Sequence, residues 1–146
     1  MQIKREAAKE QGGKDKIRKP PRSEGIQKNI RILIVEDDDS FRNSLVRTLG
    51  KNFGVKSARN GKEGLDKYKE GGIDIVITDL RMPIMDGFTL LVELQDFDSE
   101  SKIIVLSSLV TDANSCLLMC SGAKKVMVKP YDLEELNRAI QEVSKS

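Results

Sequence analysis

The chain has 146 residues, of which 38% are hydrophobic and 33% are charged, and its formal net charge is +2. This length and composition fit one domain of ordinary size with a modest extension. They exclude a membrane protein, because no stretch approaches the roughly 18 consecutive apolar residues of a membrane span and the charged N-terminus is unlike a signal peptide, so the sequence predicts a cytoplasmic protein.

The first 29 residues differ from the rest in composition. They contain nine Lys and Arg against four Asp and Glu, a net charge of +5, and only four large apolar side chains. Such a segment cannot bury enough apolar surface to form a core. We therefore predict a basic, flexible N-terminal extension over residues 1–29 and one folded domain over residues 30–146, whose own net charge is −3.

Beyond residue 29 the chain alternates between short apolar runs and stretches with helical spacing. The apolar runs predict strands at residues 30–35, 55–58, 73–78, 102–107 and 125–128. The stretches that follow them predict helices at residues 40–50, 61–71, 86–95, 110–121 and 132–144. This alternation predicts an α/β fold with a doubly wound parallel sheet, and the Ile, Val and Leu content of the strands indicates that helices cover both faces.

Polar side chains stand where the predicted strands end. The set consists of Glu36, Asp37 and Asp38 after the first strand, Asp79 after the third, Ser107 and Ser108 at the end of the fourth, and Lys129 after the fifth. The carboxyl ends of parallel strands lie along one edge of a sheet, where ligands gather at the point at which the strand order reverses. We therefore expect these side chains to meet at that edge.

The chemistry of this set points to a metal ion and a phosphoryl group. Carboxylates packed closely repel one another unless a cation lies among them. Oxygen ligands alone favour Mg²⁺, which keeps part of its water shell and shares the remaining positions with phosphate oxygens. A lysine and a hydroxyl opposite the metal would complete a clamp for a phosphoryl group, with Asp79 as the nucleophile.

Several other kinds of site are excluded by composition. The chain has no histidine, which removes Ser-His-Asp and Cys-His nucleophiles and histidine-based zinc hydrolases, and it has no phosphate-binding G-x-x-x-x-G-K run. We interpret Cys116 and Cys120, four residues apart among Leu and Met, as buried core residues of a helix rather than a metal site. Asp38, Asp39 and Ser40 are all candidates to cap the first helix, and for Asp39 and Ser40 a cap is the interpretation that we favour.

Four segments, ILIVEDD, VITDLRMPIMDG, IIVLSS and VMVKPY, together resemble the receiver domain of two-component response regulators, the CheY-like family. The resemblance covers residues 30–144. It implies a flavodoxin-like, five-stranded parallel sheet with strand order 2-1-3-4-5 and five helices. It also implies a signalling module that catalyses only its own phosphorylation and dephosphorylation and is not an enzyme with an outside substrate.

The resemblance assigns roles on the metal side of the site. Asp79 matches the phosphoacceptor, and Glu36 and Asp37 match the acidic pair that binds Mg²⁺ together with it. Arg81 matches the position whose backbone carbonyl completes the metal's protein ligands. The implied cofactor is therefore Mg²⁺, held by these four residues.

On the phosphoryl side, Ser107 matches the switch hydroxyl and Lys129 matches the lysine that pairs with the phosphoryl group. The family often has an aromatic residue three positions before this lysine, whereas this chain has Val126. We therefore expect the outward signal to arise from repacking of the fourth helix and fifth strand rather than from rotation of an aromatic ring.

The resemblance also implies partners. A chain without histidine cannot supply a phosphohistidine itself, so a separate sensor histidine kinase or histidine phosphotransfer protein is the expected phosphoryl donor. The chain stops at Ser146, just after the last predicted helix, so either an unknown downstream protein receives the signal by contact or the chain is a fragment. No membrane partner is expected.

Alternative functions differ in how well the sequence supports them. A haloacid-dehalogenase-type phosphatase also uses a strand-end Asp and Mg²⁺, but it needs a second acid two residues later, where this chain has Arg81. Two alternatives stay open, a vestigial receiver that acts as a phosphorylation-independent interaction module, and nucleic-acid binding by the basic extension. The extension has no aromatic residue to stack on bases, so nucleic-acid binding is disfavoured against a linker.

Overall fold

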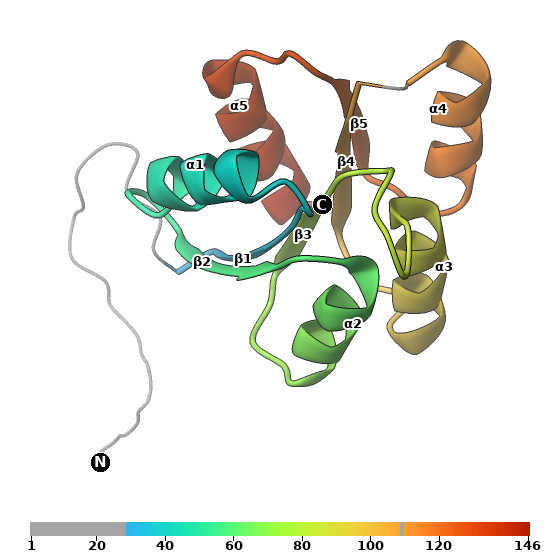
Figure 1. Cartoon of the computed structure of the whole chain (residues 1–146), viewed down its shortest axis with the longest axis horizontal. Coiled ribbons are helices and arrows are strands. Elements are labelled where there is room, and N and C mark those ends of the chain that lie inside the picture. Colours follow the sequence, from blue (N-terminus) through green and yellow to red (C-terminus); the bar gives the residue numbers. More distant parts are fainter. Residues whose placement is uncertain (1–28, 109) are drawn as a thin grey trace.

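The computed structural model describes residues 29–108 and 110–146, so almost all of the predicted extension over residues 1–29 lies outside the described part. Five strands and five helices alternate along the described residues (Figure 1). In chain order they are β1 (Arg31–Val35), α1 (Asp39–Leu49), β2 (Gly54–Ala58), α2 (Gly61–Lys69), β3 (Ile75–Thr78), α3 (Gly87–Phe97), β4 (Ile103–Ser107), α4 (Asp112–Cys120), β5 (Lys125–Val128) and α5 (Leu133–Ser144). Every predicted element within this range is present, with its ends moved by one or two residues at most.

The strands form one parallel sheet with the order β2-β1-β3-β4-β5, which confirms the predicted flavodoxin-like topology. β1 lies between β2 and β3, and its last residue, Val35, is in register with Thr78 of β3. The residues that follow these two strands, Glu36 and Asp79, are therefore neighbours at the carboxyl edge of the sheet. The order of the strands thus brings together two acids that are 43 residues apart in the chain.

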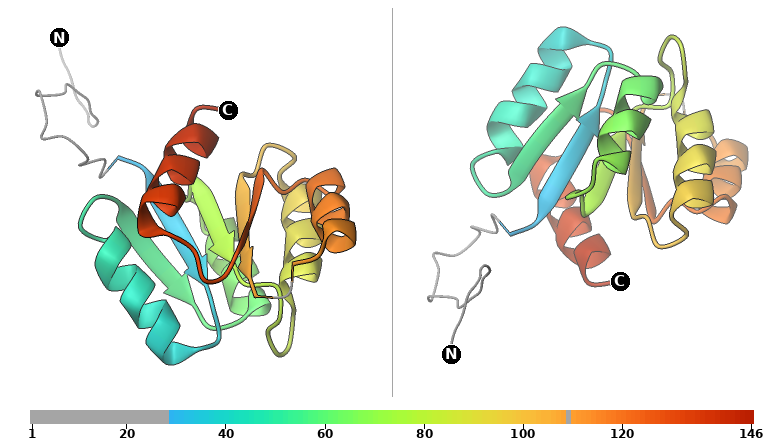
Figure 2. Two further views of the ribbon diagram at one scale, coloured as in Figure 1. Left: turned by 90° about the horizontal axis from the view of Figure 1, so that it is seen from above. Right: turned by 90° about the horizontal axis from the view of Figure 1, so that it is seen from below.

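Helices cover both faces of the sheet, as Figure 2 shows with α5 in front of the strands in one view and α2 in front in the other. Alternate strand residues point to opposite faces. Ile32 and Ile34 pack with α1 and α5, whereas Leu33 and Val35 pack with α2, α3 and α4. Burial on both faces explains why the strands consist of nearly continuous Ile, Val and Leu rather than an alternating pattern. None of the helices within residues 29–108 and 110–146 is long and apolar enough to cross a membrane.

The cap of α1 differs from the sequence interpretation. Asp38, not Asp39 or Ser40, is the N-cap, because its carboxylate accepts a hydrogen bond from the backbone N–H of Phe41 at 3.1 Å. Asp39 begins the helix instead and forms an ion pair with Arg42 at 2.5 Å. Ser40 is the second residue of α1 and so lies inside the helix rather than at its N-cap.

The two cysteines were interpreted wrongly, since both Cys116 and Cys120 are exposed. α4 turns Leu118 toward the sheet, and Leu118 is its buried residue. Residues two positions before and after Leu118 are rotated by roughly 200° around an α-helix, so they point to the opposite face. Apolar neighbours indicated burial, but the direction in which the helix packs places both thiols outside.

Candidate functional site

Three carboxylates meet at the carboxyl edge of the sheet. Glu36, Asp37 and Asp79 each offer one oxygen, and these oxygens lie within 4.8 Å of one another. Glu36 is buried, Asp79 is partly buried and Asp37 is exposed, so the cluster is open to solvent on one side. Like charges at this spacing raise the electrostatic energy of the folded protein unless cations balance them.

Asp79 is fixed by the strand that precedes it. Its backbone N–H donates to the carbonyl of Val35 at 3.1 Å, which continues the pairing of β3 with β1 by one residue. One carboxylate oxygen, Oδ1, accepts a hydrogen bond from the N–H of Leu80 at 2.7 Å. The other oxygen, Oδ2, lies 3.5 Å from Nζ of Lys129. The side chain is 14% exposed, so it is held in one orientation yet remains accessible.

Glu36 is the deepest acid of the cluster, with 3% of the residue exposed. Its Oε2 accepts from the N–H of Asp38 at 3.1 Å and its Oε1 accepts from Nζ of Lys129 at 3.1 Å. Burial raises the pKa of Glu36, and the charge of Asp79 raises it further, while the N–H of Asp38 and the ammonium of Lys129 act in the opposite direction. The pKa stays raised, so additional positive charge at this site is favourable.

Lys129 comes directly after β5, and its side chain reaches the acids that follow β1 and β3. Its backbone N–H donates to the carbonyl of Ser107 at 3.0 Å, and the bond between Lys129 and Pro130 is cis. The ammonium group contacts Glu36 and Asp79 and lies over the ring of Phe41, 4.1 Å from its centroid. The structure therefore brings together Lys129 and the acids, as the sequence predicts.

Two aromatic side chains near Lys129 were missed by the sequence analysis. Phe41 of α1 and Tyr131, which follows the cis bond, meet edge to face with ring centroids 6.2 Å apart. Burial and the charge of Glu36 raise the pKa of Tyr131 to about 12, so its hydroxyl is neutral at physiological pH. With Leu45 and Leu133, these side chains line a cleft between α1 and the β5–α5 loop. The place of Phe41 in the sequence, three residues after the N-cap Asp38, does not indicate that its ring contacts Tyr131.

Arg42 is a further residue that the sequence analysis did not identify. This arginine is only 8% exposed, and its Nη1 donates to the backbone carbonyl of Glu36 at 2.9 Å. Its Nη2 pairs with Asp39. The guanidinium group thus ties the first turn of α1 to the loop that carries the acids, and its five donors suit this double task. In the sequence, the spacing of three residues between Asp39 and Arg42 could have indicated an ion pair on a helix.

The remaining site residues lie around this centre. Ser107, the last residue of β4, is 1% exposed and stands at the same edge. Val126 on β5 packs against the side of the sheet that faces α4.

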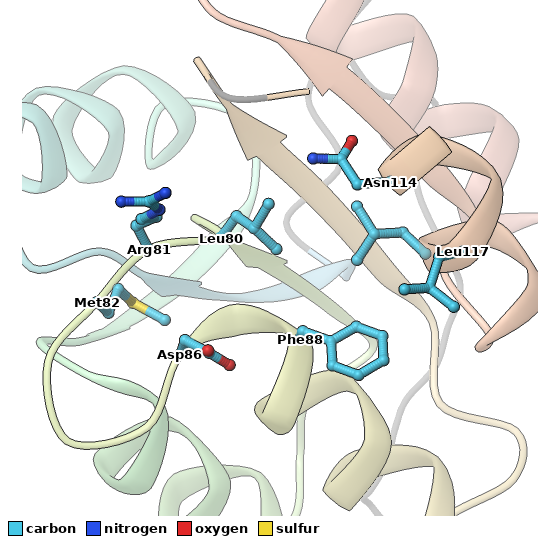
Figure 3. A pocket seen from close by; sticks show the side chains of 8 residues that line it. Leu80, Arg81, Met82, Asp86, Phe88, Asn114 and Leu117 are labelled. Carbon is cyan, nitrogen blue, oxygen red and sulfur yellow. The ribbon is translucent and has the colours of Figure 1, made fainter. Parts of the chain in front are cut away.

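Arg81 lies in the loop between β3 and α3. It is exposed and lines a cavity of about 320 Å³ between the β3–α3 loop and α4 (Figure 3). Leu80, Met82 and Phe88 lie on one side of this cavity, and Leu117 lies on the other. The role that the resemblance implies for Arg81 concerns its backbone carbonyl rather than this side chain, and it stays a prediction.

Gly87 packs closely against the backbone of Asp79 and Leu80. Its N–H donates to the carbonyl of Leu80 at 2.8 Å, and a Cβ at this position would collide with the backbone carbonyl of Asp79 and lie 2.9 Å from Cα of Leu80. We expect Gly87→Ala to lower the free energy of unfolding by about 1–3 kcal/mol, the usual cost of overpacking, because the neighbouring atoms belong to the backbone and cannot rotate away.

Urea unfolding measures this effect, and Thr89→Ala is the matched control because Thr89 is exposed on the same helix. The control should change the free energy of unfolding by less than about 0.5 kcal/mol. Equal stability of Gly87→Ala and the wild type would show that the β3–α3 loop tolerates a side chain at this point.

The donor set fits a magnesium ion. All candidate ligands are carboxylate oxygens, and Asp37 is exposed enough to leave positions for water, which Mg²⁺ retains in proteins. Burial, and after it the charge of Asp79, raise the pKa of Glu36, although the N–H of Asp38 and the ammonium of Lys129 act to lower it. Glu36, Asp37 and Asp79 are the residues that would hold the ion.

The fold and the acidic edge together define a doubly wound α/β protein with its ligand site at the carboxyl ends of the strands. The model of the response regulator receiver domain matches residues 32–141, and the chain belongs to this family. It is a signalling module of two-component systems.

Known proteins give the same assignment. The chain is 37% identical over 112 residues to chemotaxis protein CheY of Bacillus subtilis, covering 75% of this chain and 93% of that protein. It is also similar to the structure of a response regulator protein from Thermotoga maritima in complex with Mg²⁺-BeF, with a TM-score of 0.71 and 30% identity over 78% of this chain and 98% of the other. A CheX–CheY complex with BeF₃ and Mg²⁺ from Borrelia burgdorferi matches with a TM-score of 0.76 and 31% identity, over 82% of this chain and 95% of that one.

Proposed function

We propose that this receiver domain accepts a phosphoryl group on Asp79 from the phosphohistidine of a separate sensor histidine kinase or histidine phosphotransfer protein. The reaction depends on Mg²⁺ and takes place in the cytoplasm, and the phosphorylated domain signals through contacts with a downstream protein. The observation that carries this proposal is the position of Asp79, whose carboxylate lies within 4.8 Å of two further carboxylates and 3.5 Å from Lys129.

Asp79 is suited to attack phosphorus. The hydrogen bond from Leu80 to Oδ1 fixes the plane of the carboxylate. In the transfer, a new bond forms between an Asp79 oxygen and phosphorus while the bond between phosphorus and the donor's imidazole nitrogen breaks, and the nitrogen keeps the electron pair. Phosphoryl transfer depends mainly on positioning and on charge stabilisation, so an oriented nucleophile is the chief requirement.

The other residues stabilise the charge of the phosphoryl oxygens. Lys129 already contacts Asp79 and can pair with an oxygen of the group attached there, and the Ser107 hydroxyl at the end of β4 is the proposed switch donor. A bound Mg²⁺ would supply positive charge between the carboxylates and the phosphoryl oxygens. The Mg²⁺-BeF complex of the Thermotoga maritima relative supports this arrangement.

Phosphorylation with acetyl phosphate tests the proposal without a cognate kinase. In the presence of Mg²⁺ we expect one hydroxylamine-labile phosphoryl group, mapped to Asp79 by mass spectrometry. A label on another residue, or no label at all, would favour the phosphorylation-independent interaction module. The proposal treats residues 1–29 as a linker that takes no part in this chemistry.

The metal contribution can be measured separately. Mg²⁺ should raise the melting temperature of the wild type, because it balances three like charges in the native state and binds the unfolded chain poorly. Asp37→Asn removes the exposed ligand and should weaken Mg²⁺ binding by about tenfold or more, since even groups behind the ligands change metal affinity by that factor.

The control for this measurement is Asp96→Asn, which removes one exposed negative charge from α3, outside the cluster. It should leave the Mg²⁺-dependent rise in melting temperature unchanged. Unaltered Mg²⁺ binding in Asp37→Asn would mean that Asp37 is not a metal ligand and that the acids before α1 stabilise only the loop and the start of the helix.

A further inference from the structure

The ammonium group of Lys129 is held between two carboxylates and the face of an aromatic ring. Its Nζ lies 3.1 Å from Glu36 and 3.5 Å from Asp79, and it lies 4.1 Å from the ring centroid of Phe41. This last distance is well inside the roughly 6 Å over which a cation is attracted to a ring face. The lysine side chain is 21% exposed, so the contact is only partly screened by water.

The ring of Phe41 is itself fixed from two sides. The backbone N–H of Phe41 donates to the capping carboxylate of Asp38, which sets the first turn of α1. The ring meets Tyr131 edge to face at an interplanar angle of 85°, and it packs against the core between the sheet and α1 and α5. Phe41 thus connects the loop that carries the acids with the loop that carries Lys129.

An aromatic ring differs from other possible neighbours of the ammonium group. A third carboxylate would neutralise the lysine and compete with an incoming anion, and an aliphatic side chain would only remove water from it. A ring face attracts the cation through its quadrupole and leaves the full positive charge available. Tyr131 adds no net charge, because its hydroxyl is neutral at physiological pH.

We propose that Phe41 is a positioning residue that holds the Lys129 ammonium group in place for an anionic phosphoryl group bound to Asp79. The inference rests on the proposed function of Asp79 as phosphoacceptor. It assigns to the first turn of α1 a direct part in the affinity of the site for the phosphoryl group, exerted through Lys129 and without contact to that group.

Phe41 also packs in the core, so the test must separate packing from positioning. The test is a double-mutant cycle on the 146-residue chain, made up of the wild type, Phe41→Leu, Lys129→Met and the double variant. Urea unfolding checks that each protein is folded. Leucine keeps the apolar bulk and removes the ring. The probe is beryllofluoride in the presence of Mg²⁺, and the half-saturating concentration is followed by ¹⁹F NMR.

We expect Phe41→Leu to raise the half-saturating concentration by about threefold to tenfold when Lys129 is present, as loss of a partly desolvated cation–π contact implies. In the Lys129→Met background the same substitution should have no effect. Phe41→Tyr, which keeps the ring face, should bind beryllofluoride like the wild type. The ε-methylene protons of Lys129 should show an upfield ring-current shift that Phe41→Tyr retains and Phe41→Leu loses.

An equal loss of affinity on Phe41→Leu in both backgrounds would overturn the positioning role, because the effect would then not pass through Lys129. Equal impairment of Phe41→Tyr and Phe41→Leu would overturn it as well. A wild type that binds no beryllofluoride with Mg²⁺ present would overturn the proposed function itself, and that result is distinct from the other two.

Discussion

Replacing Asp79 with asparagine is expected to abolish phosphorylation by acetyl phosphate and also to stabilise the protein in the absence of Mg²⁺. The first effect follows because the amide lacks the anionic oxygen that attacks phosphorus. The second follows because, among the residues that the structure describes, Asp79 faces two other carboxylates and the single ammonium group of Lys129. Removing the net repulsion should raise the free energy of unfolding by about 1 kcal/mol at the effective dielectric of a partly buried site.

The two effects are measured on the same variant, by radiolabelling and by urea unfolding with a chelator present. Asp96→Asn again serves as the control, because it removes one negative charge on α3 away from the sheet edge. It should be labelled like the wild type and should show no gain in stability. Full labelling of Asp79→Asn would place the phosphoacceptor elsewhere, and a loss of stability would mean that its pairing with Lys129 outweighs the repulsion.

Replacing Lys129 with methionine is expected to have the opposite effect on stability. The variant leaves Glu36, which is 3% exposed, without its cation and next to the charge of Asp79. Breaking a fully buried ion pair costs roughly 3–5 kcal/mol, and because Lys129 is 21% exposed we expect a loss of about 2 kcal/mol at neutral pH. Phosphorylation-dependent output should be impaired, because the phosphoryl group loses its lysine partner.

The loss of stability in Lys129→Met should depend on pH, and the direction follows from the pKa of Glu36. The pKa of Glu36 is already raised by burial and by Asp79, and removal of Lys129 should raise it further. A raised pKa in the native state means that the native protein favours the protonated acid, so stability is greatest below the ordinary pKa of a glutamic acid and falls as pH rises through the native value. The free energies of unfolding of the variant and the wild type should therefore differ less at about pH 5 than at about pH 7.5.

Urea unfolding at the two pH values checks the prediction. Lys62→Met is a suitable control because Lys62 pairs with Asp66 on the surface of α2, where both side chains are more than half exposed. Loss of such a pair should cost less than about 0.5 kcal/mol at either pH. A destabilisation of Lys129→Met that does not depend on pH would show that Glu36 is not the group left unbalanced.

The principal acids could be predicted from the sequence because their positions follow from local rules. Asp79 comes directly after the segment IDIVIT, whose Ile and Val content indicates a buried strand, and Glu36 likewise follows the apolar run RILIV. In a parallel sheet every strand end of this kind lies at one edge, so their proximity requires no knowledge of side-chain packing. The five strands and helices were predictable for the same reason, since hydrophobic periodicity is a property of short segments.

The strand order was a different matter, because periodicity does not say which strands are neighbours. Resemblance to the receiver family supplied the order 2-1-3-4-5, and the structure confirms it. The pairing of β3 with β1 then decides that Asp79, rather than Ser107, stands next to Glu36. The arrangement of the site therefore depends on a non-local property of the chain.

The sequence by itself thus determined the elements, the edge of the sheet that carries the chemistry and the acids and lysine found there. Only the tertiary structure decided that the ammonium group of Lys129 lies over the ring of Phe41 and that Arg42 donates a hydrogen bond to the backbone carbonyl of Glu36. The same holds for the exposure of the two thiols of α4. The physical reason is that hydrophobic patterns show which face of an element is buried, whereas the partner of each side chain is set by how elements from distant parts of the chain pack together. Phe41 and Lys129 are 88 residues apart, and no local pattern relates them.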